Sequence, residues 1–245
     1  MTHTKDIEKV LYRIIEELSK ENAPIIFKGA LALKDLLYRN NPDLMIVRKT
    51  TDIDANWIDE YDKDRIITII DRAVKLVNPN YKVELYREPA NKKSMGLKVL
   101  DKDGTTFTKI DIDIIDNPFY IECSINDVNI KYSDFNKMMS DKLFSISGEF
   151  VFRRAKDLLD IYLILQEKNI YKEDIEKVLN YENRKLGDFS TMLKSKNELH
   201  HAYDSLEGIK NKPDFDIVWN SILEYLDKEK FLDNALETFD DEIEI

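Results

Sequence analysis

Cysteine and glycine are scarce in this sequence, and the few that occur exclude several classes of protein. The single cysteine, Cys123, rules out an internal disulfide and favours a reducing compartment, with the thiol buried. The six glycines form no Walker-type loop, no Gly-x-Gly-x-x-Gly and no Gly-x-Ser-x-Gly motif. No apolar run approaches the length of a membrane span, and the polar N-terminus predicts no signal peptide, so we expect a cytoplasmic protein without membrane contact.

Histidine is also rare, and basic residues are outnumbered by acidic ones. His3, His200 and His201 have neither metal-ligand spacing nor catalytic partners. A net charge of −11 argues against general affinity for nucleic acid, although it does not exclude a local basic face. One basic cluster comprises Arg153, Arg154 and Lys156. A second basic group is interpreted as a solvated helix surface: Arg184, Lys185, Lys194 and Lys196.

Carboxylates, by contrast, are abundant, and one pair of them predicts a metal site. Residues i and i+2 of a strand point to the same face, so Asp52 and Asp54 can bind one cation together while Ile53 faces the core. Carboxylate oxygens together with substrate phosphates suit Mg²⁺. Gly29, in a turn that opens a helix some twenty residues earlier, completes a pattern that suggests phosphoryl or nucleotidyl transfer.

The Asp-x-Asp pattern recurs, so a single match is weak evidence. The other matches are Asp62/Asp64, Asp101/Asp103, Asp111/Asp113 and Asp214/Asp216. Helix starts explain the first and the last, and a hairpin turn explains the second. The pair Asp111 and Asp113 instead lies among isoleucines, where a buried charge needs a partner or an ion.

The periodicity of apolar residues predicts an α+β fold with a mixed β-sheet and packed helices. A helix at 7–18, a strand at 25–28 and helices at 29–39 and 64–77 are followed by strands at 81–86, 94–100 and 107–115. Residues 120–124 and 128–130 are expected to add edge strands. Beyond residue 133 the pattern is helical, at 135–146, 151–165, 172–179 and 217–226. We therefore expect a catalytic domain at 1–132 and a helical C-terminal domain at 133–245.

The order of these motifs is similar to the DNA polymerase β-type nucleotidyltransferase superfamily, and more closely to the AbiEii/AbiGii toxin family. The resemblance implies that the mixed sheet is of the nucleotidyltransferase type. The resemblance rests on scattered motifs over roughly residues 25–165, namely Lys28-Gly29-Ala30-Leu31-Ala32-Leu33, Arg48, Thr51-Asp52-Ile53-Asp54, Ser140-Asp141-Lys142-Leu143 and the stretch from Arg154 to Tyr162. Ala30 is a departure, because the superfamily usually has Gly or Ser there, and alanine lacks the hydroxyl with which a serine can contact a phosphate. A longer gap at 39–47 is a second departure.

The resemblance implies roles for individual residues. Asp52 and Asp54 would be catalytic metal ligands for Mg²⁺ or Mn²⁺, with Asp111 as the third carboxylate and Asp113 as its rival. The resemblance implies nucleotide-binding roles for Lys28, Gly29, Ala30, Lys142, Arg154, Lys156 and Asp157. Lys142 also fits a surface lysine, and Asp157 with Asp160 also fits a helix-surface ion-pair pattern.

Three functions fit these residues. The first is a toxin that transfers NMP from an NTP to RNA, with a tRNA 3′ end and a cognate antitoxin protein implied by the resemblance. The second is a small-molecule nucleotidyltransferase of the aminoglycoside type, for which the acidic charge would suit a cationic acceptor. The third is a degenerate member that binds a nucleotide or a protein partner, which Ala30 favours and the intact carboxylates disfavour.

Overall fold

The chain forms two compact units in a computed structural model that describes residues 3–41 and 47–232. The first unit comprises Met1–Asp35 and Lys49–Asp134, and the second comprises Leu36–Arg48 and Phe135–Ile245. No helix among the described residues is long and apolar enough to cross a membrane. The division into domains that fold separately at residue 132 remains a prediction.

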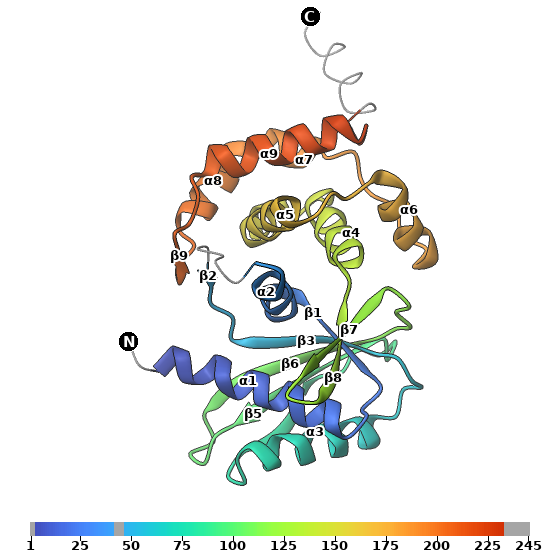
Figure 1. Cartoon of the computed structure of the whole chain (residues 1–245), viewed down its shortest axis with the longest axis vertical. Helices are drawn as coiled ribbons and strands as arrows, with labels where there is room; N and C mark the ends of the chain where they lie inside the picture. Colours follow the sequence, from blue (N-terminus) through green and yellow to red (C-terminus); the bar gives the residue numbers. More distant parts are fainter. Residues whose placement is uncertain (1–2, 42–46, 233–245) are drawn as a thin grey trace, which may run out of the picture. The chain divides into compact units, whose positions relative to one another are not determined.

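A seven-stranded mixed sheet is the centre of the first unit (Figure 1). Its elements are α1 (His3–Lys20), β1 (Ile25–Lys28), the start of α2 (Gly29–Asn40), β3 (Asp52–Trp57), α3 (Lys63–Val77), β4 (Lys82–Arg87), β5 (Ser94–Leu100), β6 (Thr106–Ile114), β7 (Tyr120–Ile125) and β8 (Val128–Ser133). The strand order is β4-β5-β6-β3-β1-β8-β7. Strands β3 and β6 are parallel, as are β1 and β8, and the other neighbours are antiparallel. This mixed sheet with packed helices confirms the expected fold class.

Strand β8, one of the last two strands of this sheet in the sequence, lies inside the sheet, although we expected both of these strands at an edge. Strand β7 is at the edge, but β8 lies between β7 and β1 and runs parallel to β1. The physical reason is burial, because Tyr132 of β8 is 0% exposed opposite Phe27 of β1, with ring centroids 6.4 Å apart. The sequence prediction ended the strand at residue 130 and so missed this contact.

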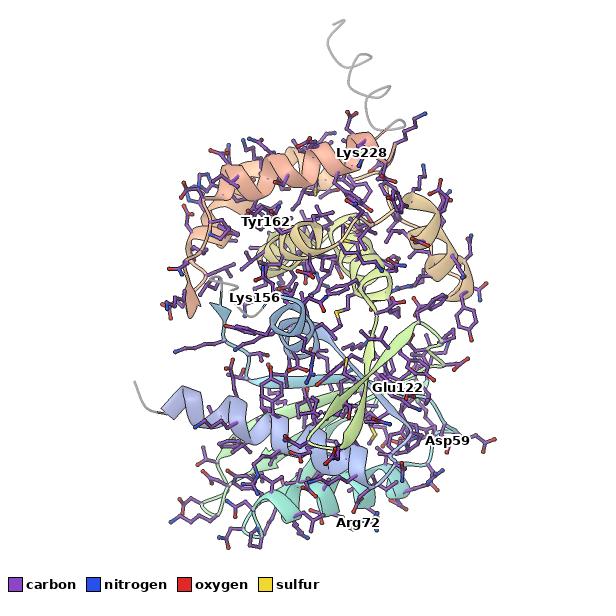
Figure 2. All side chains as sticks on the ribbon, in the orientation of Figure 1. Asp59, Arg72, Glu122, Lys156, Tyr162 and Lys228 are labelled. Carbon is purple, nitrogen blue, oxygen red and sulfur yellow. The ribbon has the colours of Figure 1, made fainter. Side chains whose placement is uncertain are left out.

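The apolar face of the sheet packs against α1 and α3, which lie together along it (Figure 1). Ile53, Ala55 and Trp57 of β3 are at most 1% exposed, and each large side chain buried in this way stabilises the fold by roughly 1.5–3 kcal/mol. Arg72 of α3, labelled in Figure 2, pairs with Glu21 just beyond α1 at 2.5 Å. Because alternate strand residues point to opposite faces, burial of Ile53 directs Asp52 and Asp54 to the other face.

The second unit is helical, as expected, with one small strand pair. Its elements are β2 (Val47–Arg48), α4 (Phe135–Ile146), the 3-10 turn η1 (Val151–Arg153), α5 (Ala155–Glu167), α6 (Lys172–Tyr181), α7 (Ser190–Lys194), α8 (Lys196–Asp204), β9 (Ile209–Lys210) and α9 (Phe215–Lys228). Strands β2 and β9 pair with each other. The prediction of a single helix at 151–165 is wrong in its first turn, because Arg154 separates the 3-10 turn η1 from the α-helix α5.

Candidate active site

The three predicted carboxylates lie on the same face of two neighbouring parallel strands. In the register of β3 and β6, Asp54 is directly opposite Asp111, and Asp52 is opposite Lys109. Neighbouring strands are about 4.8 Å apart, so opposite residues have their side chains side by side. Asp52 is exposed, whereas Asp54 and Asp111 are half-buried. The sheet therefore brings two of the three carboxylates level with each other and puts the third two residues away.

The first turn of α2 begins beside Asp54. Gly29 has a φ of +70°, and a Cβ atom on it would collide with the Oδ2 atom of Asp54. Only glycine combines this backbone conformation with room for the carboxylate. The N–H groups at the start of a helix carry a partial positive charge, which suits an anion at this position. Ala30 follows, half-buried, and offers its backbone but no hydroxyl.

Asp111 has two partners that sequence reasoning missed. The hydroxyl of Tyr86 donates to Asp111 Oδ1 at 2.9 Å, and Arg87 Nη2 donates to the same oxygen at 2.7 Å. Consecutive strand residues normally face opposite ways, but β4 has a register shift between Leu85 and Arg87, and such bulges re-aim side chains. Gly96 of β5 makes room for the tyrosine, since a Cβ atom there would lie 2.6 Å from the ring.

Electrostatics of this cluster follow from the same contacts. Burial raises the pKa of the Tyr86 hydroxyl, and the hydrogen bond to Asp111 raises it further. The hydrogen bond to Asp111 raises the pKa of Arg87, although burial opposes it. Tyr86 therefore remains a protonated donor, and Arg87 remains a cation. No sequence motif marks either residue, because their convergence depends on the bulge.

Asp113, the rival third carboxylate, has a different partner. Lys28 Nζ donates to Asp113 Oδ2 at 2.6 Å, and the Asp113 side chain is 49% exposed. Asp113 lies opposite Asn56, two residue pairs beyond the level of Asp54. Asp111 is thus the carboxylate of β6 that is level with Asp54, and Lys28 is engaged with the other one.

The chemistry of the donors fits a hard divalent cation, because all three are carboxylates on one face. Within residues 3–41 and 47–232, however, no three His, Cys, Asp or Glu side chains converge as a metal site. Both contacts to Asp111 use Oδ1, so Oδ2 is the oxygen that could take a further ligand. The carboxylates share a face, with Asp111 bound by Tyr86 and Arg87.

In the second unit, the predicted nucleotide-binding residues form a largely buried ion cluster. Lys142 Nζ of α4 lies 2.5 Å from Asp157 Oδ1 and 2.8 Å from Asp160 Oδ2, both on α5. Arg154 Nη1 is 3.6 Å from Asp157 Oδ2. Burial alone would lower the pKa of Lys142, but the charges of Asp160 and Asp157 and their hydrogen bonds outweigh it and raise the pKa. Lys156, labelled in Figure 2, is exposed.

This arrangement corrects two of the simpler interpretations of the sequence. Asp157 is 9% exposed and Asp160 is 2% exposed, so they are not a helix-surface ion pair. The Lys142 side chain is only 16% exposed, so it is not a surface lysine. Its neighbour Asp141 belongs to another cluster, in which it accepts from Lys137 at 2.7 Å and from Arg184 at 2.6 Å.

Arg184 therefore departs from the solvated helix surface predicted for the second basic group. Its side chain is 26% exposed, lies outside the helices and pairs with Glu182 as well as with Asp141. Lys185 is exposed and also lies outside the helices, whereas Lys194 ends α7 and Lys196 begins α8.

Comparison with known proteins identifies the fold. The sequence model of a family described as "Nucleotidyl transferase AbiEii toxin, Type IV TA system" matches residues 9–241. The crystal structure of JHP933 from Helicobacter pylori is similar over 100% of this chain and 99% of that one, with a TM-score of 0.59 and 17% identity. MenT4, the nucleotidyltransferase toxin Rv2826c from Mycobacterium tuberculosis H37Rv, is similar over 96% of this chain and 86% of that one, with a TM-score of 0.56 and 14% identity. No curated protein matches the sequence significantly.

Proposed function

The chain belongs to the AbiEii nucleotidyl transferase toxin family, and we propose that it transfers NMP from an NTP to a hydroxyl of RNA, at a tRNA 3′ end, in a reaction that needs Mg²⁺ or Mn²⁺. The observation that carries this proposal is the register that sets Asp54 level with Asp111, with Asp52 on the same face and the first turn of α2 beside Asp54. The family implies an antitoxin protein as a partner. The reaction would take place in the cytoplasm, as part of phage defence.

Asp52, Asp54 and Asp111 would hold the metal. A divalent cation bound there would neutralise charge on the triphosphate and align the attacking hydroxyl with the α-phosphate. Asp111 is the carboxylate that would take the proton from the hydroxyl, because its position level with Asp54 keeps it next to the metal ligands. Arg87 and Tyr86 would orient Asp111 through Oδ1, which leaves Oδ2 to face the metal and the attacking hydroxyl.

Phosphate binding is assigned to the start of α2 and, from the resemblance, to basic residues of the second unit. The backbone of Gly29 and Ala30 supplies N–H groups where the helix begins, and these could donate to a phosphate without a side-chain hydroxyl at Ala30. Lys28 lies on the same sheet face, opposite Asp54. The roles of Lys142, Arg154, Lys156 and Asp157 in nucleotide binding remain predictions, and Lys142 is occupied by Asp157 and Asp160.

A small-molecule acceptor of the aminoglycoside type is the second candidate. The net charge of −11 favours it, since a cationic acceptor would be attracted to an acidic protein. The third candidate is a degenerate member that binds a nucleotide or a protein partner without transfer.

The test is to incubate the protein with each α-labelled NTP and with Mg²⁺ or Mn²⁺, either alone, with total cellular RNA or with a panel of aminoglycosides. We expect label on small RNAs and none on RNA whose terminal hydroxyls have been oxidised with periodate. Label only on aminoglycosides would establish the second candidate in place of the first. Nucleotide binding without transfer to any acceptor would contradict both.

A further inference from the structure

Two phenylalanines are exposed next to a basic cluster in the second unit. Phe150 is 68% exposed and Phe152 is 48% exposed. Within the described residues, the only other phenylalanine in the exposed class is Phe144, at 38%, so all three lie between residues 144 and 152. Phenylalanine has no polar group to hydrate, and leaving its ring in water forgoes the stabilisation that burial gives. Exposure of two such rings within three residues therefore needs an explanation beyond folding.

A short turn holds these rings outward. Val151, between them, is 1% exposed, and the η1 turn to which it belongs packs against α8. The turn is closed by the N–H of Arg154, which donates to the carbonyl of Val151 at 2.8 Å. The two rings meet edge to face, with centroids 6.5 Å apart and an interplanar angle of 78°. The buried valine thus anchors the turn while its neighbours face solvent.

One cation lies over one of the rings, and two more follow in the sequence. The Arg153 guanidinium carbon lies 5.5 Å from the centroid of Phe152, within the range of a cation–π contact. Arg153, Arg154 and Lys156 are all exposed, and the stretch 148–156 contains one acid, Glu149. That stretch has a net charge of +2 (three basic residues and one acidic residue), in a chain whose net charge is −11. Arg154 shares its charge with Asp157 at 3.6 Å, whereas Arg153 lies over the ring.

We propose that Phe150, Phe152, Arg153, Arg154 and Lys156, called here the aromatic–basic segment, bind unpaired nucleotides of an RNA acceptor by stacking. The inference rests on the proposed function, because it takes RNA as the acceptor. Every base has a π-face that can stack on an aromatic ring, and cations beside the rings neutralise the phosphates between successive bases. Phenylalanine offers no hydrogen bonds to base edges, so the segment would bind a single-stranded end without sequence specificity.

An acidic protein is the alternative occupant, and the geometry favours RNA over it. The carboxylates of an acidic protein would pair with the cations and would have no use for the exposed rings. The two rings, with a guanidinium over one of them, provide flat surfaces of the kind on which bases stack.

The experiment measures binding of a fluorescent RNA hairpin with an unpaired four-nucleotide 3′ tail, and of the same hairpin with a blunt end, to the full-length chain. We expect the tailed RNA to bind more tightly. Phe150→Ala and Phe152→Ala should each weaken its binding about fivefold or more, since stacking of one base is typically worth that much. Phe152→Tyr should restore most of the affinity because it keeps the ring. Arg153→Gln should reduce the dependence of log K on log salt by about 0.7.

Tyr171→Ala is the matched control, since Tyr171 is 51% exposed and lies outside the segment. It should leave RNA binding unchanged. A thermal melt of each variant checks the fold, and the exposed positions make unfolding unexpected.

Transfer of label from an NTP is measured separately, so the two proposals can fail independently. Suppose that the wild type transfers label to RNA, but that the double variant with Phe150→Ala and Phe152→Ala binds the tailed hairpin as tightly as the wild type. The aromatic–basic segment would then not be the site that binds the RNA acceptor. If the wild type binds the tailed hairpin through these rings but never transfers label, the segment stands and the proposed function fails. Equal affinity for tailed and blunt RNA would also overturn the inference, and would leave a protein as the occupant to be sought.

Discussion

Gly29 shows how a single residue limits what the site can be. Its φ of +70° disfavours any side chain, and its missing Cβ leaves the space that Asp54 Oδ2 occupies. Two separate costs therefore fall on a substitution here, backbone strain and displacement of a proposed metal ligand. These costs can be separated, because Gly104 has a similar φ of +78° but nothing within 4 Å of its Cβ position.

Gly29→Ala should abolish most nucleotidyl transfer and lower stability by more than the roughly 1 kcal/mol that a positive φ alone costs alanine. Gly104→Ala should lower stability by about that amount and leave transfer intact. Activity and urea unfolding of the two variants provide the comparison. Similar activity in both variants would show that Gly29 matters only for its backbone.

The two carboxylates of β6 should differ in importance. Asp111→Asn should reduce transfer by about 100-fold or more, because it removes the proposed base level with Asp54. Asp113→Asn should reduce transfer less than about tenfold, because a half-exposed ion pair with Lys28 contributes little. Steady-state kinetics with saturating Mg²⁺ would measure both. Equal losses, or the reverse order, would show that the strand register does not identify the third carboxylate.

At the scale of elements, the sequence was informative where a residue's role depends on its own strand or helix. Alternation along 52–57 was enough to predict that Asp52 and Asp54 point away from the core, because Ile53 between them is buried. Alternation along 107–115 predicts the same for Asp111, which follows the buried Ile110. The turn at Gly104 and the helix start at Asp62 were predicted from local side-chain chemistry, and Asp62 accepts a hydrogen bond from the Arg65 N–H. These features need no knowledge of distant segments.

Features that depend on pairing between distant segments could not be predicted. The parallel pairing of β3 with β6 joins residues more than fifty positions apart in the sequence. Only the structure of the sheet therefore shows that Asp54 lies directly opposite Asp111. The contacts of Tyr86 and Arg87 depend on a bulge, and their residue types carry no signal for it. Helices α7 and α8 have five and nine residues, too few for a clear period.

Lys142 links α4 to α5, and its removal should destabilise the second unit. Lys142→Met removes the cation that Asp157 and Asp160 share in a largely buried place, which should cost about 3–5 kcal/mol. Lys156→Met, on the exposed side of α5, should change stability by less than about 0.5 kcal/mol. Urea unfolding measures both, and an unchanged midpoint for Lys142→Met would contradict the assignment.

The pH dependence of that difference follows from the direction of the pKa shift. Asp157 and Asp160 overcome the effect of burial and raise the pKa of Lys142 above its ordinary value of 10.5. A raised pKa means that the stabilisation is complete below the ordinary value and is lost only as the pH rises through the folded-state pKa. The stability gap between wild type and Lys142→Met should therefore stay constant between pH 6 and pH 9. A gap that shrinks steadily over this range would contradict a permanently charged Lys142.

At the scale of the whole molecule, the proposed function requires an acidic chain to act on substrates that are themselves anions. The net charge of −11 opposes the approach of an NTP and of RNA. Local features would offset this charge, namely a cation held by the carboxylate face of the first unit, the start of α2, and the aromatic–basic segment of the second unit. We therefore expect transfer to depend on free divalent cation and to fall steeply as salt rises.

The most direct measurement compares the fate of α-labelled and γ-labelled NTP in the presence of RNA and Mg²⁺, for the wild type and for Asp54→Asn. Asp54→Asn keeps the size of the side chain beside Gly29 while it removes the charge that would bind the metal. The account predicts that the wild type moves the α-label to RNA and releases the γ-label as pyrophosphate, and that Asp54→Asn does neither. Transfer of the γ-label to any acceptor, or full transfer of the α-label by Asp54→Asn, would contradict a nucleotidyltransferase that works through these carboxylates.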